Sequence, residues 1–243
     1  MADDVVRALE TGVRNVRVDF DTSVGDETYT MLKQSLPMTQ RLVSLVAPRL
    51  PDNGTLRLFF PDAGTAAMMV RDWRVGTNES LVPANVAFSG MRRDSPEPTD
   101  AGILVLCPRN SEADDTLRLV EEVAAAGQFM LLVNPELVNM ATTGYGLAGR
   151  RIRDLVLAKF TSAYYLRTLT WGAVAKRLGK SYSVWQEDDA LEAGYRLLRN
   201  VDAKPTFEDL EEIYDEENGL SNRADTPAFL NAFADFMRDF GRL

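Results

Sequence analysis

Three stretches in the middle of the chain decide its fold: GILVLC over Gly102–Cys107, SEADDTLRLVEEVAAA over Ser111–Ala126, and FMLLV over Phe129–Val133. The first and third are uninterrupted apolar runs, which are typical of parallel strands covered on both faces. The middle stretch has an apolar helical stripe, and Ser111 is its expected N-cap. A strand, a helix and a strand in this order predict a right-handed crossover in a parallel sheet.

The same rhythm extends toward the amino terminus. Apolar periodicity predicts helices over residues 3–10, 27–46 and 65–73, and strands over residues 16–20, 55–60 and 85–91. Pro37 lies inside the second helix, and we expect it to kink or split that helix.

The pattern changes after residue 160. Strand patterns over 160–169, 173–177 and 182–186 are joined by short connections, which predicts an antiparallel extension of the sheet. Residues 150–159 fit a helix or a strand equally well. Helices are expected over 190–199 and 206–216, and Thr226-Pro227 should start a last, phenylalanine-rich helix.

These elements predict an α/β fold with a mixed, mainly parallel central sheet, helices on both faces, and a helical C-terminal tail. We expect residues 1–217 to form a single domain, with residues 218–243 as a helical extension packed on it, against a partner, or against a membrane surface.

The amino-acid composition limits the catalytic mechanisms that are open to this chain. The 243 residues include no histidine and one cysteine, Cys107, which excludes Ser-His and His-metal mechanisms and an intrachain disulfide. We therefore expect no metal, no cofactor and, on balance, no enzyme. Cys107 should be a buried, inert thiol.

The charge of the chain excludes further functional classes. A net charge of −9 argues against general nucleic-acid binding. Residues 141–180 nevertheless carry eight bases and one acid, whereas residues 187–217 carry twelve acids and three bases. Either the two stretches complement each other in the fold, or the basic one forms a local anion site. No stretch is apolar for long enough to span a membrane, and the acidic start resembles no targeting peptide.

Three loops are candidate binding sites. Asp62, Gly64 and Thr65 lie between a strand and a helix, where they could receive an anion or simply form a capped turn. Asn134 ends another strand and could bind a ligand or stabilise a turn. The third loop is rich in glycine and ends in an arginine block, Gly149, Arg150, Arg151 and Arg153, which suits phosphate, carboxylate or an acidic protein.

The block GRRIRDLVLAKFTSAYYLRTL over Gly149–Leu169, which includes Tyr165 and Arg167, resembles a signature of a known family. FFPDAGTAA, LVNPEL and Val184-Trp185 support the likeness. The family is a domain of unknown function of cyanobacteria, algae and plant plastids. It also occurs fused to a chloroplast adenylate kinase and in low-photosystem-II-accumulation proteins.

The resemblance implies a compartment and a process rather than a reaction. We expect a plastid stromal or thylakoid-surface protein, or a cytoplasmic one in a cyanobacterium. It implies a non-enzymatic auxiliary protein for photosystem assembly that contacts a protein partner, for example a photosystem component. The alternative is a binder of, or an enzyme for, a phosphate-bearing metabolite at the strand-end loops.

Overall fold

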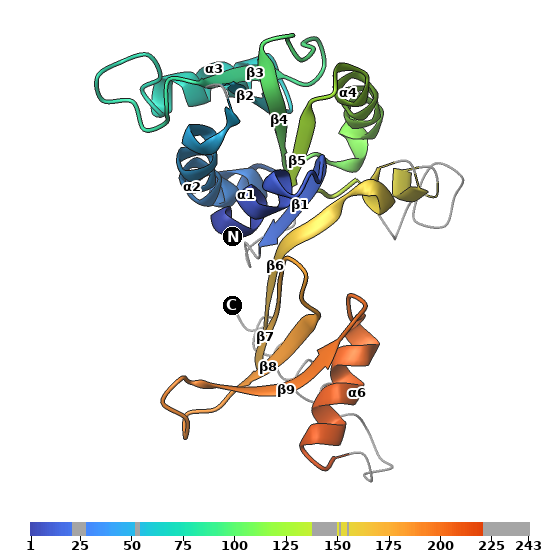
Figure 1. Cartoon of the computed structure of the whole chain (residues 1–243). Coiled ribbons are helices and arrows are strands. Elements are labelled where there is room, and N and C mark those ends of the chain that lie inside the picture. The colour runs from blue at the N-terminus through green and yellow to red at the C-terminus, as the bar shows by residue number, and fades with distance from the viewer. Residues whose placement is uncertain (21–27, 52–53, 138–149, 151, 155, 221–243) are drawn as a thin grey trace, which may run out of the picture. The chain divides into compact units, whose positions relative to one another are not determined.

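The structure, a computed structural model, describes residues 1–20, 28–51, 54–137, 150, 152–154 and 156–220 (Figure 1). The chain divides into two units. Unit 1 comprises Met1–Arg167 with Lys176–Gly179, and unit 2 comprises Thr168–Ala175 with Lys180–Leu243. The strand order through the hydrogen-bonded sheet is β3-β2-β4-β5-β1-β6-β7-β8-β9. Strands β6 and β7 contribute to both units, and each unit is described separately below.

Unit 1 is built from parallel strands and the helices that connect them. Its strands are β1 (Asn15–Phe20), β2 (Thr55–Phe60), β3 (Val86–Gly90), β4 (Asp100–Leu106), β5 (Phe129–Val133) and most of β6 (Thr161–Leu169). Its helices are α1 (Ala2–Glu10), α2 (Thr28–Val46), α3 (Ala63–Asp72) and α4 (Ala113–Ala126), with 3₁₀ turns η1 (Ala47–Arg49), η3 (Asn110–Glu112) and η4 (Leu157–Lys159). All of the pairings of β1 to β6 that the structure describes are parallel.

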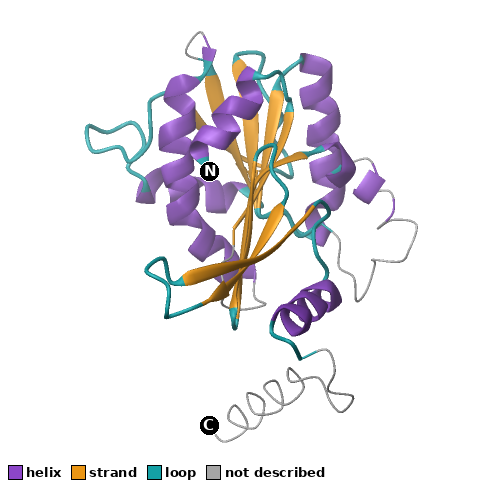
Figure 2. Ribbon diagram, turned by 60° about the horizontal axis from the view of Figure 1, so that its bottom comes forward, coloured by secondary structure: helices purple, strands orange, loops and turns teal. Residues whose placement is uncertain are grey.

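Helices cover both faces of this sheet, as Figure 2 shows. In β4, Leu104 packs with residues of α1, α2 and α3, whereas Ile103 and Val105 on the opposite face pack with residues of α4. All three side chains are fully buried. The uninterrupted apolar runs of the sequence therefore have the predicted cause, a strand buried on both faces.

A buried ion pair joins the starts of β2 and β4. The Arg57 guanidinium donates to the Asp100 carboxylate at 2.7 and 3.3 Å and to Ser89 Oγ at 3.2 Å. Glu97 approaches the same guanidinium at 2.8 Å. Gln128 Nε2 donates to the backbone carbonyls of Glu97 and Asp100, at 2.7 and 2.8 Å. This network fixes the loop that leads from β3 into β4.

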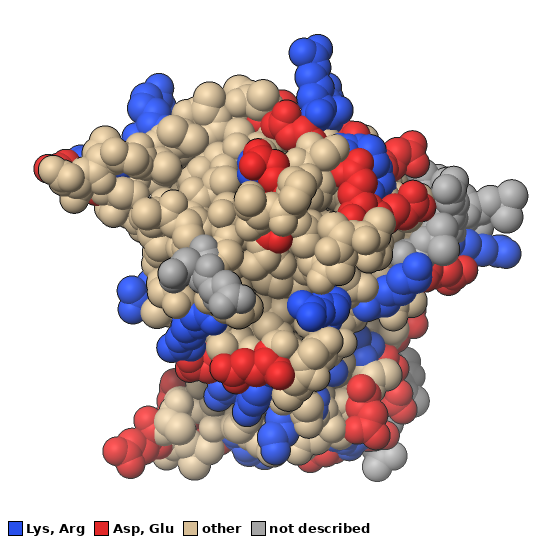
Figure 3. Space-filling model, turned by 45° about the horizontal axis from the view of Figure 1, so that its top comes forward, with Lys and Arg blue, Asp and Glu red and all other residues tan. Residues whose placement is uncertain are grey.

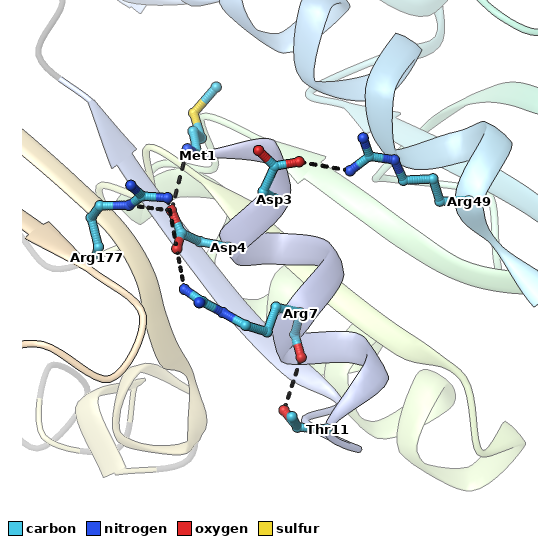
Figure 4. A network of polar contacts seen from close by, with 7 residues as sticks. All are labelled: Met1, Asp3, Asp4, Arg7, Thr11, Arg49 and Arg177. Carbon is cyan, nitrogen blue, oxygen red and sulfur yellow. Dashed lines mark hydrogen bonds and ion pairs between the residues drawn. The ribbon is translucent and has the colours of Figure 1, made fainter.

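A second buried carboxylate lies in α1 (Figure 4). Asp4 is fully buried and accepts from Arg7 at 2.6 Å and from Arg177 at 3.0 Å, and the Met1 amino group lies 3.3 Å away. Burial by itself would raise the pKa of Asp4, but the hydrogen bonds and cationic charges around it lower the pKa below its ordinary value. Asp4 thereby connects α1 to the end of β7 (Gly172–Arg177), in a segment that belongs to unit 1.

Unit 2 contains an antiparallel sheet and one described helix. Strand β8 (Tyr182–Glu187) pairs with β7 and with β9 (Tyr195–Val201), both antiparallel. Helix α6 (Phe207–Glu217) packs on one face, where Trp171 and Tyr214 make a ring contact at 4.7 Å and Arg199 pairs with Glu216 and Glu217. The predicted antiparallel extension is confirmed.

One helix prediction is wrong. Residues 190–199 form no helix: a turn leads into β9, which begins at Tyr195. Gly194 adopts a φ of +70°, and its carbonyl accepts from the Asp188 N–H at 3.0 Å, which closes the turn between β8 and β9. The helix-forming residues before Gly194 are therefore overruled by a left-handed turn and by strand pairing with β8.

Smaller expectations also need correction. Ser111 does not cap α4, because a 3₁₀ turn precedes that helix and Glu112 instead accepts from the Arg109 N–H at 2.9 Å. Helix α2 is not split, since it runs through Pro37 as one element. The helix predicted after Thr226 lies outside the described residues. The prediction of one domain over residues 1–217 stays a prediction.

Candidate functional site

The carboxyl edge of the unit 1 sheet has the topology of a ligand crevice. Strands β2 and β4 are neighbours, but α3 follows β2 on one face and α4 follows β4 on the other. Two connections that leave adjacent strands in opposite directions open a crevice between them, and open α/β sheets bind ligands there. This edge is therefore the first candidate for a site.

Asp62, Gly64 and Thr65 lie together at this edge. Asp62 caps α3: its carboxylate accepts from the Thr65 N–H at 2.8 Å and from the Thr65 hydroxyl at 2.9 Å. These bonds, the nearby charge of Arg92 and a bond from the Gly64 N–H lower the pKa of Asp62, although burial opposes the shift. Phosphate binding here stays a prediction, and a phosphate would compete with Asp62 for the same N–H groups.

A close backbone approach positions this turn. A side chain at Gly90, the last residue of β3, would place its Cβ 2.5 Å from the Ala63 nitrogen. Only glycine lets β3 end against the start of α3. Neither this contact nor two arginines at the same edge, Arg92 after β3 and Arg109 after β4, was predicted from the sequence. Their sequence signal is their position two or three residues after the end of a strand.

Asn134 has a structural role at the next part of the edge. Its side-chain oxygen accepts from the Phe20 N–H at 2.8 Å, and its amide donates to Ser35 Oγ at 3.0 Å. It thereby joins the ends of β5 and β1 to α2. Strand β4 separates Asn134 from Asp62, which places the two strand ends about 10 Å apart at ~4.8 Å per strand.

Backbone strain gathers where β4 and β5 end. Cys107 has a φ of +47° and Asn134 a φ of +46°, values that non-glycine residues rarely adopt. Asparagine tolerates this conformation better than cysteine does. Strained residues persist where their surroundings force them, and they cluster at functional sites. The two positive φ values therefore support the carboxyl edge as a candidate site.

The Cys107 thiol is a poor nucleophile. Burial raises its pKa to about 12, and the negative charge of Glu136 adds to the shift, while a hydrogen bond with Ser35 opposes it. The thiolate is the reactive form of cysteine, and almost none exists at neutral pH with this pKa. The predicted buried thiol is confirmed.

The arginine block is described in part. Gly149 and Arg151 lie outside the described residues. Arg150 is exposed, and Arg153 is half-buried. Ile152 anchors the segment by packing in the apolar cluster on the α4 side of the sheet. On β6, Tyr165 is buried and Arg167 is exposed.

A comparison with known protein families identifies the chain. The sequence profile of a domain of unknown function, DUF1995, matches residues 2–212. The chain belongs to the DUF1995 family. This confirms the resemblance drawn from the arginine block and its accompanying motifs. No curated protein matches the chain.

Two further kinds of functional feature were sought in the described part of this DUF1995 chain, a metal site and a membrane-spanning helix. Within the described ranges, no three acidic or thiol side chains gather as metal ligands would, and no helix has both the length and the apolar character to cross a membrane. Acidic and basic side chains lie interspersed on the face that Figure 3 draws.

Proposed function

We propose that this DUF1995 protein is a non-enzymatic auxiliary protein that assists the assembly of photosynthetic complexes through protein contacts. The photosynthetic process rests on the resemblance of the Gly149–Leu169 block to proteins that support photosystem II accumulation. The matching compartment is the plastid stroma or thylakoid surface, or the cytoplasm of a cyanobacterium. The protein-contact mode rests on one observation in unit 2.

That observation is a sheet face on which apolar and aromatic side chains are exposed beside one carboxylate, Glu187. Trp185 lies opposite Ala173 on β7 and Leu197 on β9, and the next residue pair on this face is Glu187 with Tyr195. Helix α6 packs on the other face of the same strands. Tyr195 and Leu197 are each 43% exposed. We call Ala173, Trp185, Tyr195 and Leu197 the unit 2 face.

The unit 2 face has the composition of a protein interface. Tryptophan and tyrosine are enriched at interface centres, because they bury a large area while a polar atom remains available for hydrogen bonding. Strand β9 ends the strand order of the described sheet, so its outer edge offers backbone groups next to this face. Arg150 adds an exposed cation in unit 1 for a separate, acidic contact.

The proposal is tested in the photosynthetic organism that encodes the chain. Deletion of the gene should slow the accumulation of photosystem complexes, measured on native gels after pulse labelling. A chain with Leu197→Lys should fail to restore the normal rate, because a further charge in the unit 2 face opposes docking. Leu81→Lys is the matched control, since Leu81 is 47% exposed in unit 1, and it should restore the rate.

Two results would overturn the proposal. One is normal photosystem accumulation in the deletion strain, which would refute a role in photosystem assembly. The other is full rescue by Leu197→Lys, which would refute the unit 2 face as the contact surface. For the arginine block, capture of a photosystem component from thylakoid extracts should be lost when Arg150→Ala and Arg151→Ala are combined, and unchanged capture would remove that part of the site.

A further inference from the structure

Unit 1 has a cavity of about 340 Å³ at the amino edge of its sheet, opposite the edge where α/β folds bind most ligands. Helix α1, the end of α2 with η1, and the first residues of β4 and β5 enclose it. Its lining includes Val6, Leu9, Val46 and Phe129 among the apolar residues, and Arg14 and Arg49 among the charged ones. The volume lies in the range of small-molecule pockets.

The walls of this cavity are mainly apolar. Val6, Val46, Leu50 and Phe129 are all buried, and Leu9 is partly buried. These side chains carry no polar group that binds water. An apolar ligand would therefore displace few hydrogen bonds from the cavity, and its transfer out of water would favour binding.

The charged side chains of the lining are exposed and mostly basic. Arg14, Arg49 and Glu10 all lie on the exposed side. Within the described part of the chain, no carboxylate lies within ion-pair distance of Arg14. Arg49 donates to Asp3 at 2.8 Å, as Figure 4 shows, but Asp3 is 80% exposed and engages only one nitrogen of the guanidinium. An arginine fork binds carboxylates well, so both guanidinium groups have capacity for another anion.

We infer that this cavity binds a small amphiphilic carboxylate, with its hydrocarbon tail among the apolar walls and its carboxylate at Arg14 and Arg49. At about 30 Å³ per heavy atom, the volume of one molecule in liquid water, the cavity holds roughly eleven heavy atoms. This size matches an acyl carboxylate of about ten carbons. Sugar phosphates fit poorly because the walls are apolar, and membrane lipids with two long chains exceed the volume.

This site is independent of the unit 2 face and of the proposed assembly function, so either can fail without the other. Isothermal titration calorimetry on the full chain, with acyl carboxylates below their micelle concentrations, tests it. Affinity should rise about fourfold per methylene from hexanoate to decanoate, and should level off beyond the length that fills the cavity. Decylamine should bind at least tenfold more weakly than decanoate, because it meets two arginines.

Matched variants locate the binding. Arg49→Gln should weaken decanoate binding several-fold, whereas Asp3→Asn should strengthen it by removing the competing carboxylate. Leu9→Trp should abolish binding by filling the cavity, with an unfolding midpoint near that of the wild type as the check on folding. Arg71→Gln, at an exposed pair on α3, is the control and should leave binding unchanged.

Any of these outcomes would overturn the inference: equal binding of decylamine and decanoate, no dependence on chain length, or unchanged binding in a folded Leu9→Trp variant. Binding of apolar peptides but not of decanoate would likewise overturn it and would point to a protein contact at this edge instead.

Discussion

Substitution Asp100→Asn should destabilise unit 1 strongly, because it removes the main counter-charge of a buried arginine. The Arg57 side chain is 11% exposed and the Asp100 side chain 0%, so water cannot replace the lost partner. Removing one member of a buried ion pair costs about 3–5 kcal/mol. Glu97 still approaches Arg57 at 2.8 Å but is 60% exposed, so the lower end, about 3 kcal/mol, is expected.

Urea unfolding at pH 7, followed by circular dichroism, measures this cost, and the thermal midpoint should fall by roughly 6–12 °C. The control is Asp72→Asn. Its partner Arg71 is 75% exposed and Asp72 is 42% exposed, so less than about 1 kcal/mol should be lost. If Asp100→Asn costs no more than Asp72→Asn, the buried-pair reasoning is refuted.

A double variant separates charge from packing. Arg57→Met combined with Asp100→Leu replaces both charged groups with apolar side chains of similar length, and such replacements are often close to neutral. The double variant should therefore recover most of the stability that Asp100→Asn loses. If it is as unstable as the single variant, the network with Ser89 and Gln128 matters for its geometry rather than for its charge balance.

Three further predictions concern single residues. Because the pKa of Asp4 is lowered in the folded state, its carboxylate stabilises the fold fully above the unfolded pKa of about 3.8, and this stabilisation is lost as the pH falls through the folded pKa. In acid unfolding experiments, the free energy of unfolding of Asp4→Asn should therefore fall less between neutral and acidic pH than that of the wild type. Cys107 should resist a thiol reagent such as Ellman's at pH 8 in the native protein and react in urea; fast native labelling would contradict its burial. Asp62→Ala should cost about 1 kcal/mol through the lost cap of α3, while Asp62→Asn, which retains a capping oxygen, should cost less; equal losses would argue against the cap.

Much of the fold follows from local pattern. The runs Gly102–Leu106 in β4 and Phe129–Val133 in β5 contain no polar side chain, because both faces of these strands are buried. Helix α6 begins after Thr206, whose hydroxyl accepts from the Asp209 N–H, a signal contained within four consecutive residues. The ends of such elements are marked by residues within the element or next to it, so these elements were predictable from the sequence.

The candidate site was predictable only as a set of loops. Strand ends that precede a turn were recognisable, and Asp62, Gly64, Thr65 and Asn134 were found in this way. Their roles were not, because the bonds from Asn134 reach 114 and 99 residues along the chain, to Phe20 and Ser35. The sequence pattern predicted parallel and antiparallel pairing between strands that are close in the sequence, but it did not identify β1 as the neighbour of β5.

Local sequence therefore accounts for the strands, the covered faces and the inert thiol, because burial and periodicity act over a few neighbouring residues. Tertiary structure alone decided that residues 195–201 join β8 as a strand, that Arg57 finds Asp100, and that α1, η1 and the starts of β4 and β5 enclose a cavity. Each of these depends on groups brought together from distant parts of the chain, and the gain from pairing them outweighs the local preference.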